Sequence, residues 1–467
     1  MGSLGVWNVR GLNSLDKQKD ILWCLHNANV DLFGLLETRV KPGSLNKVVD
    51  SLCHGWNYCT NHQYHAGGRI WLLWKDRKYK VNVLDMEAQF IHVKVEDIIN
   101  NYMFYVTFVY GFNKIEERIP LWDAMVRLTL KEPWIIMGDF NNVLHMDEKI
   151  GLPVKDSETM PFQDAIDRCG LQDMKCTGSF FTWNNKQPNS TRVFSRIDRV
   201  LVNDEWLTKW HDYFAHYAPE GEYDHCPCFI RAGDTTLRQK RPFKFFNMWT
   251  GVPDFLMIVE NGWNENVYGT RMYKVVRKLK MLKANLKGLN KDLFSDIERN
   301  SDIAHELLIN AQRHLHDDPH NTTLRDNEYN IRASFQTLHK AKIEFLRQKA
   351  KCEWARDGDS NSAMFHKAIR QRQLANKVLQ IEDINGQLCN TPEGIMKAFE
   401  DYYQELLGVQ GTTEGFMATI VSRGDRVQQT DWPILSKLPN KEEIKNILFD
   451  IPDDKSPGPD GYSSLLL

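Results

Sequence analysis

Short apolar runs alternate with amphipathic stretches over about the first 230 residues, as in a protein whose strands alternate with helices. The run at 103–110 is apolar and aromatic almost throughout, which is typical of a strand buried on both faces. Residues 18–29 and 121–130 show helical spacing instead. This alternation predicts an α/β domain whose sheets are covered by helices. The expected strands are 5–9, 31–37, 69–74, 90–95, 103–110, 134–139 and 196–202.

The pattern becomes helical after about residue 231. Apolar residues recur every three or four positions from 272 to 297 and again along 324–354. We therefore expect two long antiparallel helices joined by a turn at 316–323. The remaining expected elements are a helix ending near 372, a hairpin from 378 with its turn at Asn385-Gly386, and helices at 391–407 and 441–449.

Composition narrows the classes of protein. With 467 residues and 42% hydrophobic content, the chain has enough apolar material for about two to four domains. A formal net charge of −2 excludes a globally basic nucleic-acid binder, but not a locally basic segment. Nine cysteines without a regular framework predict reduced thiols in an intracellular compartment. We find no secretory signal, and the longest apolar stretch, 102–110, is too short to span a bilayer.

Carboxylates, amides and a histidine follow the expected strands where these end. Strand ends are where ligand-binding groups converge in α/β sheets. Mg²⁺ takes hard oxygen ligands, and phosphoester hydrolysis also needs a group that activates water and donors for the growing phosphate charge. The sequence therefore predicts a metal-assisted hydrolytic site. Its candidate residues are Asn8, Glu37, Tyr110, Asn113, Asp139, Asn141, Asp198, Asp224 and His225.

Each of these residues alone also has an ordinary structural interpretation. Asn8 would close a turn before Gly11, and Glu37 would cap a strand where it meets solvent. Tyr110 fits a core position, and Asp224-His225 fits a loop. Asp139 and Asn141 are more specific, because the buried strand Trp134-Ile-Ile-Met ends on Gly138 and presents both side chains on one side. Asp198 lies inside an otherwise apolar strand, so its charge needs a partner.

Their order and context resemble the endonuclease/exonuclease/phosphatase superfamily, which includes AP endonucleases, DNase I and the endonuclease domains of LINE-type (non-LTR) retrotransposons. The resemblance covers about 225 residues and implies a four-layer α/β sandwich of the DNase I type, with two mixed sheets face to face. It rests on Trp7-Asn-Val-Arg-Gly-Leu-Asn13, Leu35-Leu-Glu-Thr-Arg39, Phe108-Val-Tyr-Gly-Phe-Asn113, Trp134-Ile-Ile-Met-Gly-Asp-Phe-Asn141, Phe180-Phe-Thr-Trp183, Ser195-Arg-Ile-Asp-Arg199 and Tyr223-Asp-His225.

The resemblance also implies roles for the site residues. Glu37 would be the principal Mg²⁺ ligand, with Asn8 beside it and Asp224 completing the metal side; Mn²⁺ would substitute for Mg²⁺. Asp139 would orient or deprotonate the attacking water. His225, paired with Asp198, would stabilise the transition state. The remaining contacts to the phosphate would come from Tyr110, Asn113 and Asn141.

Two positions depart from the family pattern. Arg10 stands where many repair-type relatives carry an acidic residue, and Tyr223 stands where a serine usually precedes Asp-His. Neither departure removes a catalytic group, although Tyr223 bears on the geometry of its loop.

The second half resembles the linker and the start of the reverse transcriptase in plant LINE-type proteins. The matching stretches are Arg241-Pro-Phe-Lys-Phe-Phe-Asn-Met-Trp249, Gly358-Asp-Ser-Asn-Ser-Ala-Met-Phe-His366 and Lys455-Ser-Pro-Gly-Pro-Asp-Gly461. The resemblance implies an endonuclease domain at 1–231, a linker at 232–252, a helical hairpin at 253–356 and an incomplete fingers segment at 357–467. The palm with its paired aspartates is absent, so we expect no polymerase activity from this chain. We also expect residues beyond about 380 to be partly disordered.

Basic residues gather in the same half. They are either a solvated helix face or a surface that holds template RNA or target DNA. The candidates are Arg347, Lys349, Lys351, Lys367, Arg370 and Arg372.

The function favoured by these patterns is a Mg²⁺-dependent endonuclease that acts on DNA and leaves a 3′-hydroxyl. Element RNA is a second expected partner, and neither a membrane nor a small-molecule cofactor is expected. Nuclear action follows from the resemblance alone. Two alternatives stay open, namely a phosphatase of the same superfamily, since the fold is shared, and a non-catalytic remnant that binds nucleic acid.

Overall fold

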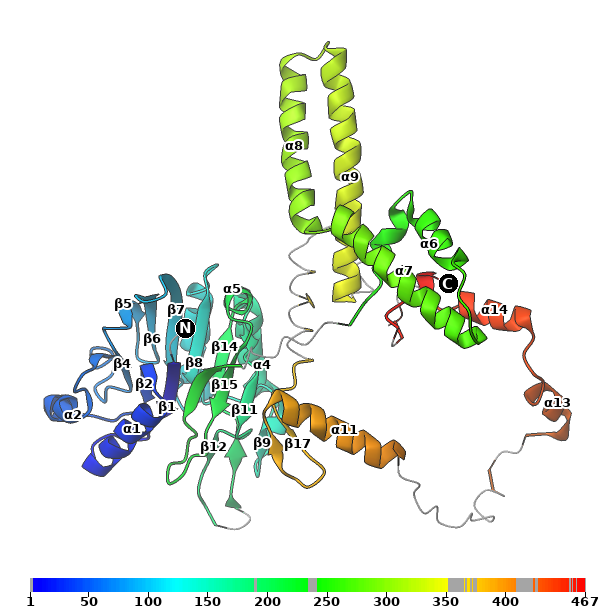
Figure 1. The fold of residues 1–467 in the computed structure, drawn as a ribbon. Coiled ribbons are helices and arrows are strands. Elements are labelled where there is room, and N and C mark those ends of the chain that lie inside the picture. The colour runs from blue at the N-terminus through cyan, green and yellow to red at the C-terminus, as the bar shows by residue number, and fades with distance from the viewer. Residues whose placement is uncertain are drawn as a thin grey trace. The chain divides into compact units, whose positions relative to one another are not determined.

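Two compact units make up the chain in the computed structural model. The first comprises Met1–Arg238 with Val378–Val409, and the second comprises Gln239–Lys377 with Gln410–Leu467 (Figure 1). The structure describes residues 3–188, 191–233, 242–351, 365, 368–369, 372, 376–408, 423–424, 427–452, 455, 457–458 and 460–466.

The first sheet of the first unit contains, among the described residues, seven strands. β1 and β2 are parallel at its centre, and the neighbouring β1–β16 and β2–β4 pairs are antiparallel. In order across the sheet, the strands are β11 (Cys176–Gly178), β15 (Tyr213–Tyr217), β16 (Cys228–Ala232), β1 (Ser3–Asn8), β2 (Val30–Leu36), β4 (Ile70–Trp74) and β3 (Asn57–Thr60).

The second sheet, counted over the same residues, has six strands, with a parallel β7–β8 pair at its centre. Their order is β10 (Gln172–Asp173), β14 (Asp198–Val202), β8 (Trp134–Asp139), β7 (Tyr102–Tyr110), β6 (Phe90–Asp97) and β5 (Tyr79–Met86). A small third sheet joins β12 (Trp183–Asn184), β13 (Phe194–Ser195) and β9 (Lys149–Ile150).

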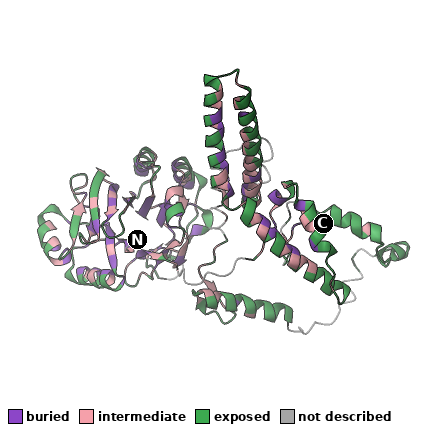
Figure 2. Cartoon of the chain, turned by 45° about the horizontal axis from the view of Figure 1, so that its top comes forward, coloured by how far each residue is buried: buried purple, intermediate pink, exposed green. Residues whose placement is uncertain are grey.

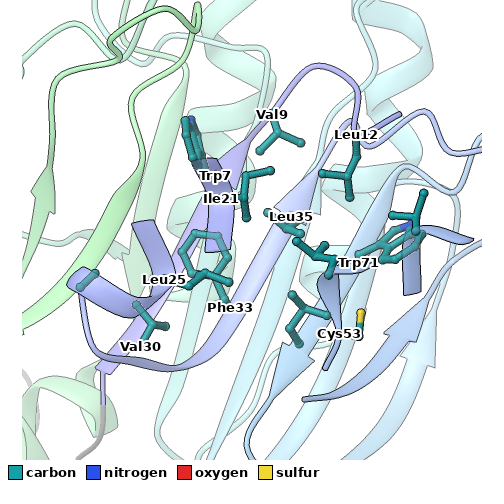
Figure 3. Packing of buried hydrophobic residues seen from close by; sticks show 14 of the residues in the cluster. Trp7, Val9, Leu12, Ile21, Leu25, Val30, Phe33, Leu35, Cys53 and Trp71 are labelled. Carbon is teal, nitrogen blue, oxygen red and sulfur yellow. The ribbon is translucent and has the colours of Figure 1, made fainter. Parts of the chain in front are cut away.

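The two large sheets pack face to face, and helices cover their outer faces. Gly34 of β2 shows how close the sheets come, because a Cβ at that position would lie 2.2 Å from the Phe108 ring of β7. The outer face of the first sheet packs against α1 (Leu15–Asn27) and α2 (Leu45–Leu52) through a cluster that includes Phe33 and Trp71 (Figure 3). The outer face of the second sheet packs against α3 (Ile115–Arg127) and α4 (Asp156–Cys169). The unit is therefore the four-layer sandwich that the sequence predicts.

Most of the expected strands are confirmed, with small shifts of their ends. The expected strand 196–202 begins two residues later, as β14 at Asp198. The expected helix 121–130 begins earlier, at Ile115. The 14-residue helix α4, the short helices α2 and α5 (Asp204–Lys209), and the edge strands were not apparent from the apolar pattern.

The second unit is helical, and its helices differ from the expected pair. The single helix expected over 272–297 is wrong: α7 (Arg271–Leu293) ends before Asp296, whose φ of +58° is left-handed and incompatible with a continuing helix. The antiparallel pair is instead α8 (Ile297–Asp317) with α9 (Thr322–Ala350), joined at the predicted turn (Figure 1). η4 (Asn247–Gly251) and α6 (Phe255–Asn264) pack with α7 and α9 around Phe245, Trp249 and Leu286.

The last described elements agree with the predicted hairpin and helices. β17 (Ile381–Glu382) and β18 (Leu388–Cys389) flank Gly386, which has a φ of +73°, and α11 (Pro392–Gly408) and α14 (Lys441–Phe449) follow. α13 (Trp432–Leu435) is a further short helix. Of the candidate basic residues, Lys367 and Arg370 lie outside the described residues. So does most of the stretch 358–366, which resembles the start of a reverse transcriptase. Among the described helices, none combines the length and apolar content needed to cross a membrane.

Candidate active site

Three neighbouring strands of the second sheet bring Tyr110, Asp139 and Asp198 into one row. Tyr110 pairs with Asp139 in the β7–β8 register, and Asp139 pairs with Asp198 in the β8–β14 register. Gly138 makes this approach feasible, because its φ is +149° and a Cβ there would lie 2.0 Å from the Val109 carbonyl oxygen. The pattern of a buried strand that ends on Gly-Asp thus follows from backbone packing.

The first sheet contributes Asn8 and Glu37 from the opposite side. β1 and β2 run parallel and end together, with Asn8 beside Leu36, so Glu37 emerges next to Asn8. The Asn8 amide donates through Nδ2 to Asp139 Oδ2 at 2.8 Å. The backbone N–H of Asn141 donates to the other oxygen, Asp139 Oδ1, also at 2.8 Å. One buried carboxylate is thereby fixed by groups from both sheets.

His225 lies beside this carboxylate and is held by its own partners. Its Nδ1 is 2.9 Å from Asp198 Oδ2, and its Nε2 is 3.8 Å from Asp139 Oδ2. The Trp7 indole N–H donates to the His225 carbonyl oxygen at 3.0 Å. His225, Asp139 and Asp198 are all buried. An imidazole fixed by a carboxylate on Nδ1 presents Nε2 toward Asp139.

Burial and charge shift the titration of these groups in useful directions. Burial, with the nearby negative charge of Asp198, raises the pKa of Asp139 to about 7. Burial alone would lower the pKa of His225, but the carboxylates of Asp198 and Asp139 outweigh it and raise that pKa to about 9. Burial, together with Glu37 and Asp139, also raises the pKa of Tyr110, which keeps its hydroxyl neutral. The site therefore favours a carboxyl group that exchanges protons near neutral pH beside an imidazolium.

Two further carboxylates at the site contact arginines. Glu37 Oε1 accepts from Arg39 Nε at 2.9 Å and lies 3.6 Å from Arg69 NH1. Asp224 Oδ2 lies 2.5 Å from Arg10 NH1. Among the described residues, the side-chain hydrogen bonds and ion pairs of Glu37 run through Oε1.

The backbone around the site is strained. Arg10, Glu37, Arg39 and Asn141 have φ between +43° and +52°, a region that residues other than glycine rarely adopt. Such conformations cost of order 1–3 kcal/mol each and cluster at functional sites. These left-handed conformations occur just after the ends of β1, β2 and β8, where the chain presents four polar side chains.

A cavity of about 360 Å³ opens between these groups. Its wall combines carboxylates, amides and cations from both sheets with the Trp183 ring. The lining includes Arg10, Glu37, Arg39, Asn113, Asp139, Asn141, Lys149, Trp183, Asp224 and His225.

Residues 5–220 match the profile of the Endonuclease/Exonuclease/phosphatase family. The matched residues lie within the first unit. An exodeoxyribonuclease from Bacillus subtilis (strain 168) is 24% identical over 243 residues, which cover 47% of this chain and 95% of the bacterial protein.

Solved structures with a similar chain course include two nucleases. The endonuclease domain of TRAS1, a telomere-specific non-LTR retrotransposon, is 12% identical with a TM-score of 0.38, and the match covers 51% of this chain and 100% of the solved chain. The AP endonuclease LMAP from Leishmania major is 14% identical with a TM-score of 0.41, and the match covers 50% and 88%.

The structure brings together the residues that the sequence nominated. Asn8, Asp139, Asn141, Asp198 and His225 are linked by the contacts above. Tyr110 lies in the same row, and Glu37, Asn113 and Asp224 line the cavity. Sequence reasoning missed Arg39, Arg69, Lys149 and Trp183 as parts of the site. Arg39 and Trp183 stand inside two matching stretches, which was the available signal.

The donor set suits a divalent cation. Asp139, Asp198 and His225 offer ligand atoms within 4.8 Å of one another, so this buried group could hold one. The carboxylates of Glu37 and Asp224, which line the cavity, and the buried Asn8 amide are further oxygen donors. Mg²⁺ prefers oxygen ligands and usually takes one or two carboxylates.

A buried ion cluster supports the strand that carries Asp198. The fully buried Arg199 side chain contacts Glu148 and lies 2.6 Å from Asp173 Oδ2. Glu148 Oε2 also accepts from the backbone N–H of Leu144 at 2.7 Å. Burial alone would raise the pKa of Glu148, but Arg199 and this N–H outweigh it and lower that pKa.

Breaking this cluster is expected to destabilise the first unit. Arg199→Met removes the cation that contacts Glu148 and one of the two cations that contact Asp173, which keeps Arg196 at 2.9 Å. It should lower the free energy of unfolding by about 3–5 kcal/mol. Arg127→Met is the matched control: it removes an exposed pair with Asp85 and Glu87, which should cost at most about 1 kcal/mol. Urea denaturation followed by far-ultraviolet circular dichroism measures both. Equal losses in the two variants would contradict the account.

Proposed function

We propose that this chain is a Mg²⁺-dependent endonuclease that hydrolyses phosphodiester bonds in DNA. The observation that carries the proposal is the buried carboxylate Asp139, held 2.8 Å from Asn8 and 3.8 Å from the Asp198-bound His225 on the wall of a polar cavity. This places a proton acceptor and a cationic donor within reach of one reacting group. In-line attack of water on a phosphate needs this combination.

Glu37, Asn8 and Asp224 would hold the Mg²⁺ ion, and Mn²⁺ would substitute for it. The hydrogen bonds and ion pairs of the Glu37 side chain with the described residues use Oε1 and leave Oε2 for an ion, and Glu37 lines the cavity. When bound, the ion supplies Lewis-acid neutralisation of phosphate charge. Arg10 and Arg39, which contact Asp224 and Glu37, would turn toward substrate phosphates.

Asp139 accepts the proton of the attacking water, and its raised pKa suits a base that works near neutral pH. The water oxygen bonds to phosphorus, the bond from phosphorus to the 3′-oxygen breaks, and the 3′-oxygen leaves with that bond's electron pair and takes a proton from solvent to become the 3′-hydroxyl. His225 is protonated at neutral pH because Asp198 and Asp139 raise its pKa, and its Nε2–H donates to the phosphate oxygen that gains charge. Asp198 keeps the ring oriented through Nδ1.

Tyr110, Asn113 and Asn141 position the phosphate. Asn141 Nδ2 donates to the Gly111 carbonyl oxygen at 2.7 Å, which fixes the amide beside Asp139. The Tyr110 hydroxyl stays neutral because burial raises its pKa, so it donates a hydrogen bond without adding negative charge. Neutral amide and hydroxyl donors suit a phosphodiester, which carries a single negative charge, whereas a phosphomonoester carries up to two.

Several features favour DNA over a phosphomonoester. Arg10, Arg39 and Lys149 place cations along the cavity, and the Trp183 ring offers a flat face to a base or sugar. The matching stretches in both halves support the proposal that this activity originated as the target-nicking step of a LINE-type element. The proposal includes action in the nucleus and the element's RNA as a second partner. A 3′-hydroxyl product serves such an element as a primer.

The test compares substrates and product ends. With Mg²⁺, the chain should nick supercoiled plasmid, and an added DNA polymerase should extend the nick without end repair. Phosphate release from inositol phosphates and lipid head groups should be slower by roughly two orders of magnitude, because a monoester lacks the flanking contacts. Faster release from a monoester than from plasmid would identify a phosphatase. Binding without hydrolysis of either substrate would identify a non-catalytic remnant.

A further inference from the structure

α7 concentrates positive charge in a chain whose net charge is −2. Its 23 residues include eight lysines and arginines and a single acid, Asp292. The helices that follow mix the two signs, as solvated helices usually do. In α7 the basic residues stand three or four positions apart, as Lys283, Lys287 and Lys291 do, and like charges at this spacing destabilise a helix by about 0.2–0.5 kcal/mol per pair.

The exposed side of α7 carries this charge. Leu282, Leu286 and Leu289 are buried in the core of the second unit. Lys280 and Lys287 each precede a buried leucine by two residues, which is about 200° around a helix, so they lie on the opposite side. Both are exposed, as are Arg277 and Lys291. Figure 2 shows exposed residues, in green, along the helices of this unit. None of the α7 cations forms an ion pair with a described residue.

Exposed aromatic rings adjoin the start of this basic face. Tyr268 is 89% exposed, Tyr273 is 51% exposed and Trp263 is 42% exposed. Lys278 Nζ lies 5.7 Å from the Trp263 ring centroid, which joins the aromatic and basic surfaces. Tyr273 packs over Gly269, where a Cβ would lie 2.7 Å from its ring.

We propose that α7 and the α6–α7 turn form a binding surface for single-stranded nucleic acid, separate from the nuclease centre. The lysines and arginines neutralise the phosphate backbone, and relief of their mutual repulsion adds to binding. Tyr268, Tyr273 and Trp263 offer flat faces on which unpaired bases stack. A base-paired duplex hides those faces, so the aromatic rings favour a single strand.

The charge contribution is tested with two fourfold variants of the full chain. One carries Arg277→Gln, Lys280→Gln, Lys287→Gln and Lys291→Gln. The matched control removes four exposed cations from the neighbouring helices through Arg299→Gln, Arg313→Gln, Arg325→Gln and Lys340→Gln. Fluorescence anisotropy in EDTA, which prevents cleavage, measures binding to an unstructured oligonucleotide of about 20 residues as DNA, as RNA and as duplex.

The α7 variant should bind single strands at least about tenfold more weakly near 0.1 M salt, and the slope of log affinity against log salt should fall by about 3. The control variant should stay within about threefold of the wild type. Tyr268→Ala should weaken single-strand binding at least about fivefold, whereas Tyr329→Ala, which removes a 70% exposed ring from α9, should not.

Binding measured in EDTA needs no hydrolysis, which separates this test from the test of the nuclease proposal. The DNA and RNA arms show which strand binds more tightly. Equal weakening by the two fourfold variants, undiminished binding by Tyr268→Ala, or tighter binding of the duplex would overturn the proposal.

Discussion

Asp139→Asn should lower the rate of plasmid nicking by about two to four orders of magnitude, and His225→Gln should lower it by at least about two. Asparagine keeps the size of Asp139 and can still accept from Asn8, but it cannot take a proton from water. Glutamine in place of His225 removes the cation that meets the charge growing on the phosphate. Both effects act mainly in the transition state, so the turnover number should fall more than the KM rises.

Matched controls separate chemistry from folding. Asp164→Asn removes a carboxylate that is 67% exposed on α4, and His211→Gln removes an imidazole that is 73% exposed. Both should nick at the wild-type rate. Thermal unfolding of all four variants reports whether the fold survives. A folded Asp139→Asn or His225→Gln protein with the wild-type rate would refute the role of that residue.

Glu37→Gln should weaken Mn²⁺ binding by at least about tenfold, because it removes an anionic oxygen ligand from the proposed metal set. Asp198→Asn should change Mn²⁺ affinity by less than about threefold, since we assign Asp198 to His225 rather than to the ion. Titration of the full chain with Mn²⁺, followed by the electron paramagnetic resonance of the free ion, measures both affinities without any turnover.

This pair of variants decides between the two candidate metal sets. Asp139, Asp198 and His225 are the alternative, because their ligand atoms lie within 4.8 Å of one another. If that group held the ion, Asp198→Asn would lose affinity and Glu37→Gln would keep it. That result would assign the metal to Asp139, Asp198 and His225 and would contradict the assignment to Glu37, Asn8 and Asp224.

The sequence predicted the centre of the first unit because its strands are apolar and end abruptly on polar residues. Trp134 to Met137 are fully buried, and Asp139 follows directly through Gly138. The register of β7, β8 and β14 depends on long-range pairing, so the row formed by Tyr110, Asp139 and Asp198 could only be seen in three dimensions. The contacts of Arg10 and Arg39 were missed for the same reason.

Prediction was weaker in the helical half. An apolar stripe continues through the break at Asp296, because Ile297 stays in phase with the α7 leucines although the backbone turns left-handed between them. The spacing of apolar residues in α7 does not reveal its positive charge. The net charge of each predicted helix, counted separately, does reveal it.

The end of the stretch 455–461 contributes to the packing of the second unit. The Phe245 N–H donates to the Gly461 carbonyl oxygen at 2.8 Å, and the Tyr462 hydroxyl donates to the Leu279 carbonyl oxygen at 2.6 Å. Gly461 has a φ of +85°, and a Cβ there would lie 2.1 Å from the Phe243 carbonyl oxygen. Phe243 and Phe245 of the predicted linker therefore pack against Gly461 at the end of this stretch. The assignment of the loop to a polymerase fingers segment stays a prediction.

The measurement that bears most directly on the central claim is relaxation of supercoiled plasmid by the full chain with Mg²⁺ and with EDTA. Phosphodiester hydrolysis assisted by a metal predicts nicked plasmid with Mg²⁺ or Mn²⁺ and none in EDTA, with activity restored when Mg²⁺ is added back in excess. Equal relaxation in EDTA would contradict it. So would intact plasmid in the presence of an ion that the same preparation demonstrably binds.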